Sequence, residues 1–305
     1  PAQSPGTQYA DDNGGTEYFL SSRAVFTDDG TSNSILLWSL TNTSSLSSST
    51  PSLGLSIKTI GVDTYGVPPQ ARQKATADAN LPLLSCLKDP NPACKGAVGA
   101  AAPDPFLANE AESKLDSNDS RFGQVFYANG KVWGSLGTAV TFGSGATADT
   151  RAGLAYYIIN PTAGKIVVQG TAGVEHTDLT YGSVAVLENG RGVLSFTLTG
   201  DNDFPSVGYA SLDAQIGMGD IHIAAAGLGP QDGFSGYWDF KSTRPTPRPR
   251  WGDYGAGAVD GNAIWFAAEY IGQTCTYTQY LADMTCGGTR APLGNWDTHI
   301  AKVTP

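Results

Sequence analysis

The sequence has few charged side chains and few histidines, and it contains no long apolar run. Charged residues make up 15% of the 305 positions, and only three residues are histidines. No apolar stretch reaches the roughly 18 residues that a membrane-spanning helix needs, and helical periodicity exceeds about two turns only around 106–115. These absences exclude a transmembrane helix and a helical bundle. The histidines, His176, His222 and His299, lack the spacing of zinc or copper ligands.

Several catalytic motifs are also missing. The chain has no nucleophile elbow, no phosphate-binding loop and no dinucleotide fingerprint. No motif therefore requires a cofactor. The chain does not start with methionine and carries no signal peptide. We interpret it as a processed or truncated part of a longer secreted precursor.

The charge balance is acidic. Lys and Arg number 18 against 28 Asp and Glu, which gives a net charge of −10. Such a chain is a poor binder of nucleic acid and of anionic membranes, because phosphate contacts need an excess of Lys and Arg. We expect no nucleic-acid partner and no membrane insertion. Cationic partners, neutral sugars and divalent metals stay open.

The four cysteines form two local pairs, Cys86 with Cys94 and Cys275 with Cys286. Neither pair has the Cys-x-x-Cys spacing of a zinc site, and no histidine lies near either of them. An even number of cysteines in local pairs indicates two disulfides that each close a loop. Disulfides persist in oxidising compartments, so we expect a secreted, extracellular or cell-surface protein.

The sequence is rich in glycine and repeats one hairpin pattern. It has 38 glycines, and three segments share an aromatic–glycine pair, an apolar strand, a turn and a second apolar strand. The aromatic–glycine pairs and turns are Phe122-Gly123 with Asn129-Gly130, Tyr181-Gly182 with Asn189-Gly190, and Tyr254-Gly255 with Asp260-Gly261. Asn-Gly and Asp-Gly favour two-residue hairpin turns. A hairpin repeated at a spacing of roughly 40–60 residues is typical of a β-propeller.

We therefore predict an all-β chain with a single domain, 1–305, in the form of a β-propeller of four-stranded antiparallel blades. About four blades are expected; their approximate ranges are 17–62, 120–173, 179–227 and 251–303. Residues 63–116 lack strand periodicity, so we expect a long insertion over one rim, pinned by a Cys86–Cys94 disulfide. The last blade shows too few strands, and an open ring leaves exposed strand edges. Either residues 1–10 supply the missing strand, or a further N-terminal segment or a second chain completes the ring; we favour the second alternative.

Six stretches spread over nearly the whole chain carry a resemblance. They are GGTEYFLSS (14–22), WSLTNTSSL (38–46), RFGQVFYANGKVWGSLGTAV (121–140), LGPQDGFSGY (228–237), RWGDYGAGAVDG (250–261) and GNWDTHIAKV (294–303). They resemble the C-terminal portion of large secreted bacterial β-propeller proteins, most of uncharacterised function and some loosely sialidase-like. The resemblance implies a larger ring of roughly six to eight blades. It supplies no catalytic motif, and the Ser-x-Asp-x-Gly-x-Thr-Trp box of sialidases is absent.

Ligands of propellers bind over the central channel, on loops that lead into the inner strands. Polar and aromatic residues just before these strands are therefore candidate ligand-binding residues: Arg121, His176, Arg250, Trp251 and Tyr254. Trp251 and Tyr254 could stack on a sugar. Packing between blades is the alternative role for these two aromatics, and an ion pair between blades is the alternative for Arg250.

Three carboxylates are candidate catalytic residues: Asp253, Glu269 and Glu17. The Glu-Tyr pairs at 17–18 and 269–270 could place two carboxylates across the channel. A separation of about 5–9 Å between them would suit glycoside cleavage. A structural role is the alternative for the two glutamates, and backbone capping in a turn is the alternative for Asp253.

The acidic turns are candidate calcium-binding sites. A hard cation needs only clustered oxygen ligands. The candidate ligands are Asp28, Asp29, Asp201 and Asp203. None of these turns has the spacing of an EF-hand loop, so ordinary surface turns are the alternative.

Two functions remain open at this stage. The first is a secreted, non-catalytic binding, adhesive or assembly module, and the lack of catalytic motifs favours it. The second is a glycan-active enzyme, a glycoside hydrolase or lyase, with its site over the propeller channel. An extracellular glycan is a candidate partner in either case.

Overall fold

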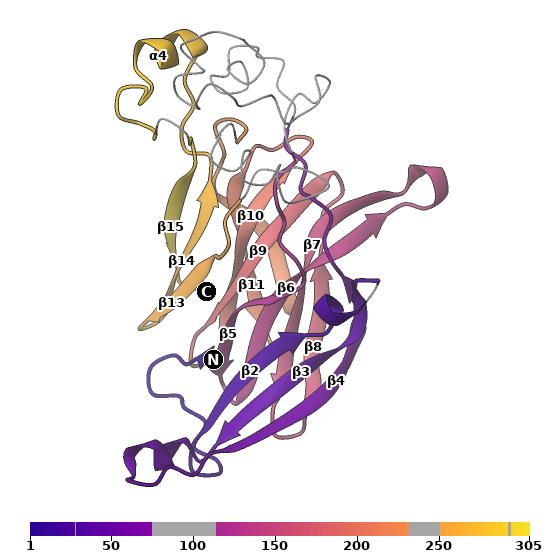
Figure 1. Ribbon diagram of the computed structural model, residues 1–305, viewed down its shortest axis with the longest axis vertical. Helices are drawn as coiled ribbons and strands as arrows, with labels where there is room; N and C mark the ends of the chain where they lie inside the picture. Colours follow the sequence, from indigo (N-terminus) through magenta and orange to yellow (C-terminus); the bar gives the residue numbers. More distant parts are fainter. Residues whose placement is uncertain (28, 75–113, 232–250, 292–293) are drawn as a thin grey trace.

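The residues that the structure describes form four sheets (Figure 1). The computed structural model describes residues 1–27, 29–74, 114–231, 251–291 and 294–305. The first sheet contains β2 (Thr16–Ser22), β3 (Thr31–Thr41) and β4 (Gly54–Gly66). The second contains β1 (Ala2–Gln3), β5 (Phe122–Ala128), β6 (Lys131–Phe142), β7 (Asp149–Asn160) and β8 (Lys165–Ala172). The third contains β9 (Thr177–Val186), β10 (Arg191–Gly200), β11 (Ser206–Asp213) and β12 (Gly217–Ala225), and the fourth β13 (Ala256–Asp260), β14 (Ala263–Tyr270) and β15 (Asp297–Val303).

The all-β prediction is confirmed. Neighbouring strands pair antiparallel throughout, except that β1 pairs in parallel with β5. The helices of the described ranges are η1 (Ala24–Phe26), η2 (Thr43–Ser47), η3 (Gly145–Thr147) and α4 (Tyr277–Ala282). None of them is long and apolar enough to cross a bilayer. The predicted Cys275–Cys286 disulfide is present and closes the loop that holds α4.

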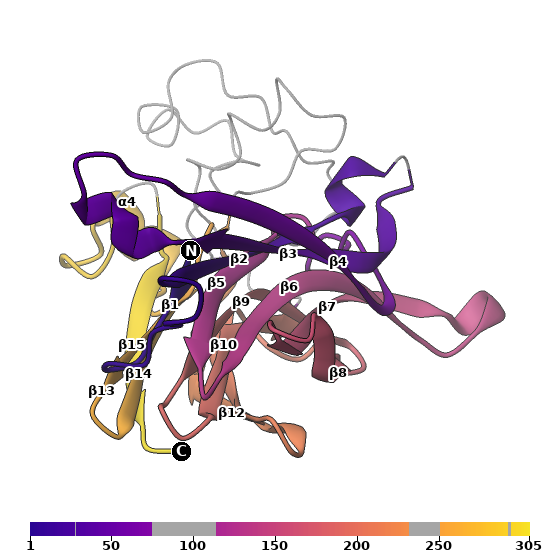
Figure 2. The same ribbon diagram turned by 90° about the horizontal axis from the view of Figure 1, so that it is seen from below.

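Each sheet packs against the next in chain order (Figure 2). Two apolar clusters hold them together. One joins the second, third and fourth sheets, and the other joins the first and second. β7 lies in the middle of this stack, and all nine residues from 151 to 159 are buried. Its nearly continuous apolar sequence therefore reflects burial on both faces.

The hairpin turns lie where the sequence predicts them, but their forms differ. Asn129-Gly130 has positive φ at both residues, 51° and 66°, as a type I′ turn requires. The last hairpin turns at Gly261-Asn262 instead of Asp260-Gly261, with positive φ only at its first residue, which is the type II′ pattern. At Asn189-Gly190 only the glycine has positive φ, 84°.

Three strands from three sheets run in the same direction and lie very close together: β5 of the second sheet, β9 of the third and β13 of the fourth. A Cβ on Gly123 of β5 would lie 2.5 Å from the carbonyl oxygen of Gly182 in β9, so only glycine fits there. The side-chain oxygen of Gln124 accepts hydrogen bonds from Ser183 Oγ of β9 at 2.9 Å and from Gly257 N of β13 at 2.6 Å. One side chain of β5 thus connects three sheets.

The first sheet departs from this pattern. Tyr18, near the start of β2, packs on Tyr127, near the end of β5, with ring centroids 5.5 Å apart. Leu20, further along β2, lies over Gly134, which pairs with Val125 in β5. β2 therefore runs against β5, whereas β9 and β13 run with it. The described residues form no closed barrel or ring.

The segment predicted as an insertion, 63–116, begins later than expected, because β4 continues to Gly66. Ala71 and Leu115 pair in an isolated bridge and are both buried. This bridge holds the two ends of the intervening chain together. Residues 75–113 lie outside the described residues, and the Cys86–Cys94 disulfide stays a prediction.

Candidate functional site

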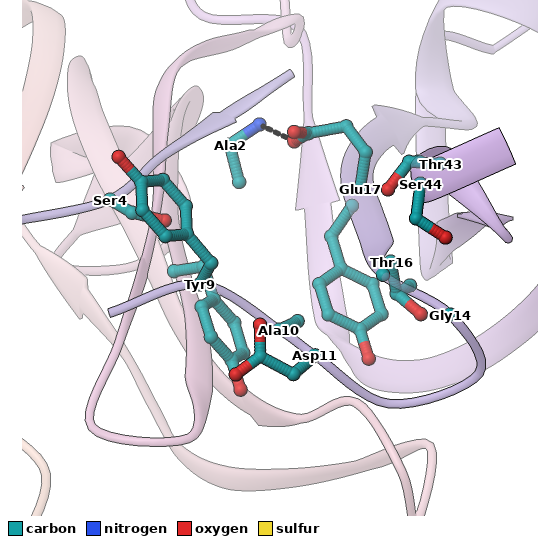
Figure 3. Close-up of a pocket in the computed structure, with 13 residues that line it drawn as sticks. Ala2, Ser4, Tyr9, Ala10, Asp11, Gly14, Thr16, Glu17, Thr43 and Ser44 are labelled. Carbon is teal, nitrogen blue, oxygen red and sulfur yellow. Dashed lines mark hydrogen bonds between the residues drawn. The ribbon is translucent and has the colours of Figure 1, made fainter. Parts of the chain in front are cut away.

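A cavity of about 570 Å³ lies where the start of β2 meets the end of β5 (Figure 3). The N-terminal loop and η2 complete its wall. Its lining residues are Ala2, Ser4, Tyr9, Ala10, Asp11, Gly14, Gly15, Thr16, Glu17, Tyr18, Thr43, Ser44 and Tyr127. We call it the tyrosine pocket, because Tyr9, Tyr18 and Tyr127 supply its aromatic surface.

Two of the three tyrosines are fixed by strands, and the third lies in a loop. Alternation along β2 turns Tyr18 to the same face as Leu20, and only 7% of its surface is exposed. Tyr127 faces it from β5, with the two ring planes inclined by 30°. Tyr9, in the N-terminal loop, is 66% exposed. The pocket therefore has a rigid aromatic floor and an accessible aromatic rim.

Backbone hydrogen bonds fix the loop that carries Tyr9. Gly14 and Gly15 have positive φ, 72° and 87°. Their carbonyl oxygens accept hydrogen bonds from the backbone amides of Ser44 and Thr43 at 3.0 and 3.1 Å, at the start of η2. The rim of the pocket is thus tied to the end of the first sheet.

Acidic side chains surround the tyrosines of the pocket. Burial raises the pKa of Tyr18, and Tyr127 and the charge of Asp12 raise it further. Burial also raises the pKa of Tyr127, together with the charges of Asp12 and Asp11. Both hydroxyls therefore stay protonated at neutral pH and can donate hydrogen bonds.

The arrangement suits a small polar ligand with apolar faces, such as a sugar. Aromatic rings contribute apolar contact, while hydroxyls and carboxylates fix orientation. Glu17, predicted as a candidate catalytic residue, lies in this wall, where its Oε1 accepts a hydrogen bond from Ala2 N at 2.9 Å (Figure 3). One carboxylate oxygen is thus occupied by the backbone of β1.

A second, smaller cavity of about 160 Å³ lies at the opposite end of β5. Its lining residues are Ser117, Asn118, Asp119, Arg121, Phe122, Gly123, Leu136, Gly137, Tyr181, Gly182, Asp253, Tyr254 and Gly255. We call it the aromatic–glycine crevice, because all three aromatic–glycine pairs meet there. It brings together the predicted residues Arg121, Asp253 and Tyr254. Tyr254 is 85% exposed, and Arg121 pairs with Asp119 at 2.7 Å. Arg250, predicted for the same site, lies outside the described residues.

Glu269 lies behind this crevice and does not line it. Its Oε2 accepts a hydrogen bond from Gly252 N at 2.6 Å. Burial raises the pKa of Glu269 to about 7; the hydrogen bond from Gly252 opposes this rise and the charge of Asp253 adds to it. The carboxyl thereby orders the backbone that leads to Tyr254. The structure does not bring Glu269 and Glu17 together, since Glu17 lies in the tyrosine pocket at the other end of the sheets.

The structure buries Trp251, which the sequence predicts as a ligand-binding residue. Its side chain is only 1% exposed, packed with Ala71, Leu115 and Ile271. Its Nε1 donates a hydrogen bond to Thr197 Oγ1 at 3.3 Å. A buried indole is not placed to stack on a sugar, and these contacts favour the packing alternative.

His176 belongs to an ionic cluster and lines neither cavity. Arg151, with 1% of its side chain exposed, pairs with Asp201 at 2.6 Å and with Asp178 at 3.3 Å. His176 Nδ1 lies 3.3 Å from the same Asp201 oxygen. The cluster connects β7 with β9 and with the turn after β10, which indicates a structural role between the second and third sheets.

The described residues contain no group of three or more His, Cys, Asp or Glu side chains that could hold a metal ion. Hydrogen bonding to Arg151 lowers the pKa of Asp201 and uses its carboxylate. Asp29 accepts a hydrogen bond from Thr31 N within its own turn, and Asp203 closes its turn through its backbone carbonyl. These three aspartates are thus engaged within their own turns or with Arg151. Asp28 lies outside the described residues, and calcium binding stays a prediction.

Sequence reasoning missed the tyrosines of the larger pocket. Tyr18 and Tyr127 lie in strands with ordinary alternation, and Tyr9 lies in a segment predicted only as a loop. The available signal was the acidic and aromatic content of residues 9–18. It could not show that Tyr127, more than 100 residues later, completes the site.

No protein-family model matches the chain, and a search of curated proteins finds no match either. These comparisons neither support nor contradict the resemblance to secreted β-propeller proteins. The function must therefore be inferred from the geometry of the candidate sites.

Proposed function

We propose that the protein is a secreted, non-catalytic β-sheet module that binds an extracellular glycan in the tyrosine pocket. The observation that carries the proposal is a cavity of about 570 Å³ with three tyrosine rings and a polar wall. Cavities of this size are typical of small-molecule sites. The Cys275–Cys286 disulfide supports an extracellular location, because disulfides persist in oxidising compartments.

The state of the carboxylates favours binding over catalysis. The carboxyl with a pKa of about 7, Glu269, is held by Gly252 and lines neither cavity. In the tyrosine pocket, Glu17 is bonded to the backbone of Ala2. An acid and a base aimed at one glycosidic bond, as cleavage requires, are not formed by these two residues.

A glycan array followed by calorimetric titration of the best ligand tests the proposal. Tyr9→Ala and Tyr127→Ala should each weaken binding about 3- to 10-fold, the loss expected for one aromatic contact. Tyr254→Ala is the matched control, because it removes an exposed tyrosine from the other cavity. Binding that survives both pocket variants but is lost in Tyr254→Ala would move the site to the aromatic–glycine crevice and defeat the proposal.

A glycan-cleaving activity is the second candidate. The observation in its favour is the pKa of Glu269, about 7, which suits a general acid. The carboxylate of Asp253 is close enough to act on this pKa. A hydrolysis screen with purified protein checks it. Release of sugar that disappears in Asp253→Asn or Glu269→Gln would establish this function in place of the non-catalytic one.

We also propose that the sheets belong to a propeller completed by a further segment or a second chain. The glycine-packed first strands of three sheets, which run in one direction, support it. The outer face of the first sheet also supports this proposal, because its apolar residues Leu55 and Ile57 are 63% and 51% exposed and a further segment or chain could cover them. If a second copy covers this face, size exclusion with light scattering should show an oligomer that Ile57→Lys dissociates. A monomeric wild type would leave only a segment of the same polypeptide.

A further inference from the structure

We infer that the tyrosine pocket selects saccharides that carry a free, protonated amine over neutral and N-acetylated ones. The inference rests on the proposed function, because it names the ligand class of the same site.

The charges of the wall point to a cationic ligand. The lining contains two carboxylates, Asp11 and Glu17, and no Lys or Arg. Figure 3 shows Glu17 above and Asp11 below the opening in this view. Asp12 is not part of the lining, but its charge acts on both Tyr18 and Tyr127. An anionic group would be repelled by these carboxylates.

The tyrosine rings reinforce the same choice. A cation over the face of a tyrosine within about 6 Å is attracted by the ring quadrupole. Tyr18 and Tyr127 lie with ring centroids 5.5 Å apart at the floor, and Tyr9 lies at the rim. An ammonium group on a sugar can therefore meet a carboxylate oxygen while the apolar face of the sugar ring contacts a tyrosine.

The carboxylate of Glu17 is positioned for this role. Its Oε1 is fixed by Ala2 N at 2.9 Å, so the side chain is already oriented before a ligand binds. Orientation in advance reduces the entropy lost on binding. An N-acetyl group removes the positive charge and adds bulk, so it loses the charge-assisted hydrogen bond.

The test is calorimetric titration at about pH 6, where a sugar amine is protonated, with three probes of equal length: a β-1,4-linked glucosamine tetramer, its N-acetylated form and a glucose tetramer. We expect the glucosamine tetramer to bind roughly tenfold more tightly than the other two, as one charge-assisted contact allows. Added salt should reduce that advantage.

Asp11→Asn and Glu17→Gln should lower the affinity for the glucosamine tetramer more than that for the N-acetylated one. Gln at position 17 keeps an oxygen that can accept from Ala2 N, so the wall stays in place. Asp220→Asn, on β12 of the third sheet, is the control for net charge and should keep the advantage. Equal affinity for the three tetramers, or an advantage that survives the Asp11→Asn/Glu17→Gln double variant, would overturn the inference and leave the proposed function standing. Binding of none of the three would overturn the inference, while the glycan array decides the proposed function separately.

Discussion

Replacing Glu269 by Gln should make the protein more stable at high pH and leave it nearly unchanged at low pH. Burial raises the pKa of Glu269 from its ordinary 4.5 to about 7. The folded state therefore binds this proton more tightly than the unfolded state, and between these two pH values the free energy of unfolding falls as pH rises. At about 1.4 kcal/mol for each pH unit, the full loss is on the order of 3 kcal/mol and is complete above pH 7.

Gln cannot ionise, and its side-chain oxygen can still accept from Gly252 N. Urea unfolding of wild type and Glu269→Gln at pH values from about 5 to 8 should therefore show a difference that grows toward about 3 kcal/mol as the wild type ionises. Asp283→Asn is the control. Hydrogen bonds from Thr285 and Gly287 lower the pKa of Asp283, so that carboxylate is ionised throughout this range and its replacement should change stability by the same amount at every pH. A difference between wild type and Glu269→Gln that does not vary with pH would refute the reasoning.

Three further substitutions test the packing, each by denaturant unfolding. Gly123→Ala should cost about 1–3 kcal/mol, because its Cβ would lie 2.5 Å from the Gly182 carbonyl oxygen, whereas Gly61→Ala, with nothing within 4 Å, should stay within about 0.5 kcal/mol of wild type. Trp251→Ala should cost about 3–5 kcal/mol by leaving a cavity in the core; a loss below about 1 kcal/mol would contradict its burial. Arg151→Met should cost about 3–5 kcal/mol, since it leaves the buried carboxylate of Asp178 without its cationic partner, and an unchanged midpoint would show that the ionic cluster is not structural.

The β-class and the hairpins could be predicted because their information is local. An Asn-Gly pair between apolar strands needs a turn at that point, and the structure has one. The direction of β2 relative to β5 could not be predicted from local sequence. It depends on Tyr18 and Leu20 packing against β5, which follows in the chain only after the 63–116 segment.

The candidate site shows the same limit at the level of single residues. The sequence predicts the same role for Trp251 and Tyr254, which are three positions apart, yet Trp251 is 1% and Tyr254 85% exposed. The difference arises because Trp251 precedes the fourth sheet and packs on Ile271 and on the Ala71–Leu115 bridge. No local pattern distinguishes an aromatic that fills a gap between distant segments from one that faces solvent.

The inverted first sheet is also what creates the tyrosine pocket. If β2 ran in the same direction as β5, β9 and β13, its start would lie beside Phe122, at the end where the aromatic–glycine crevice forms. Tyr18 would then be remote from Tyr127, and the N-terminal loop could not reach the end of β5. Because β2 runs against β5, the residues before β2 and the residues at the end of β5 meet and enclose a cavity. The binding site we propose therefore arises where the repeat of like sheets is broken, between β2 of the first sheet and β5 of the second.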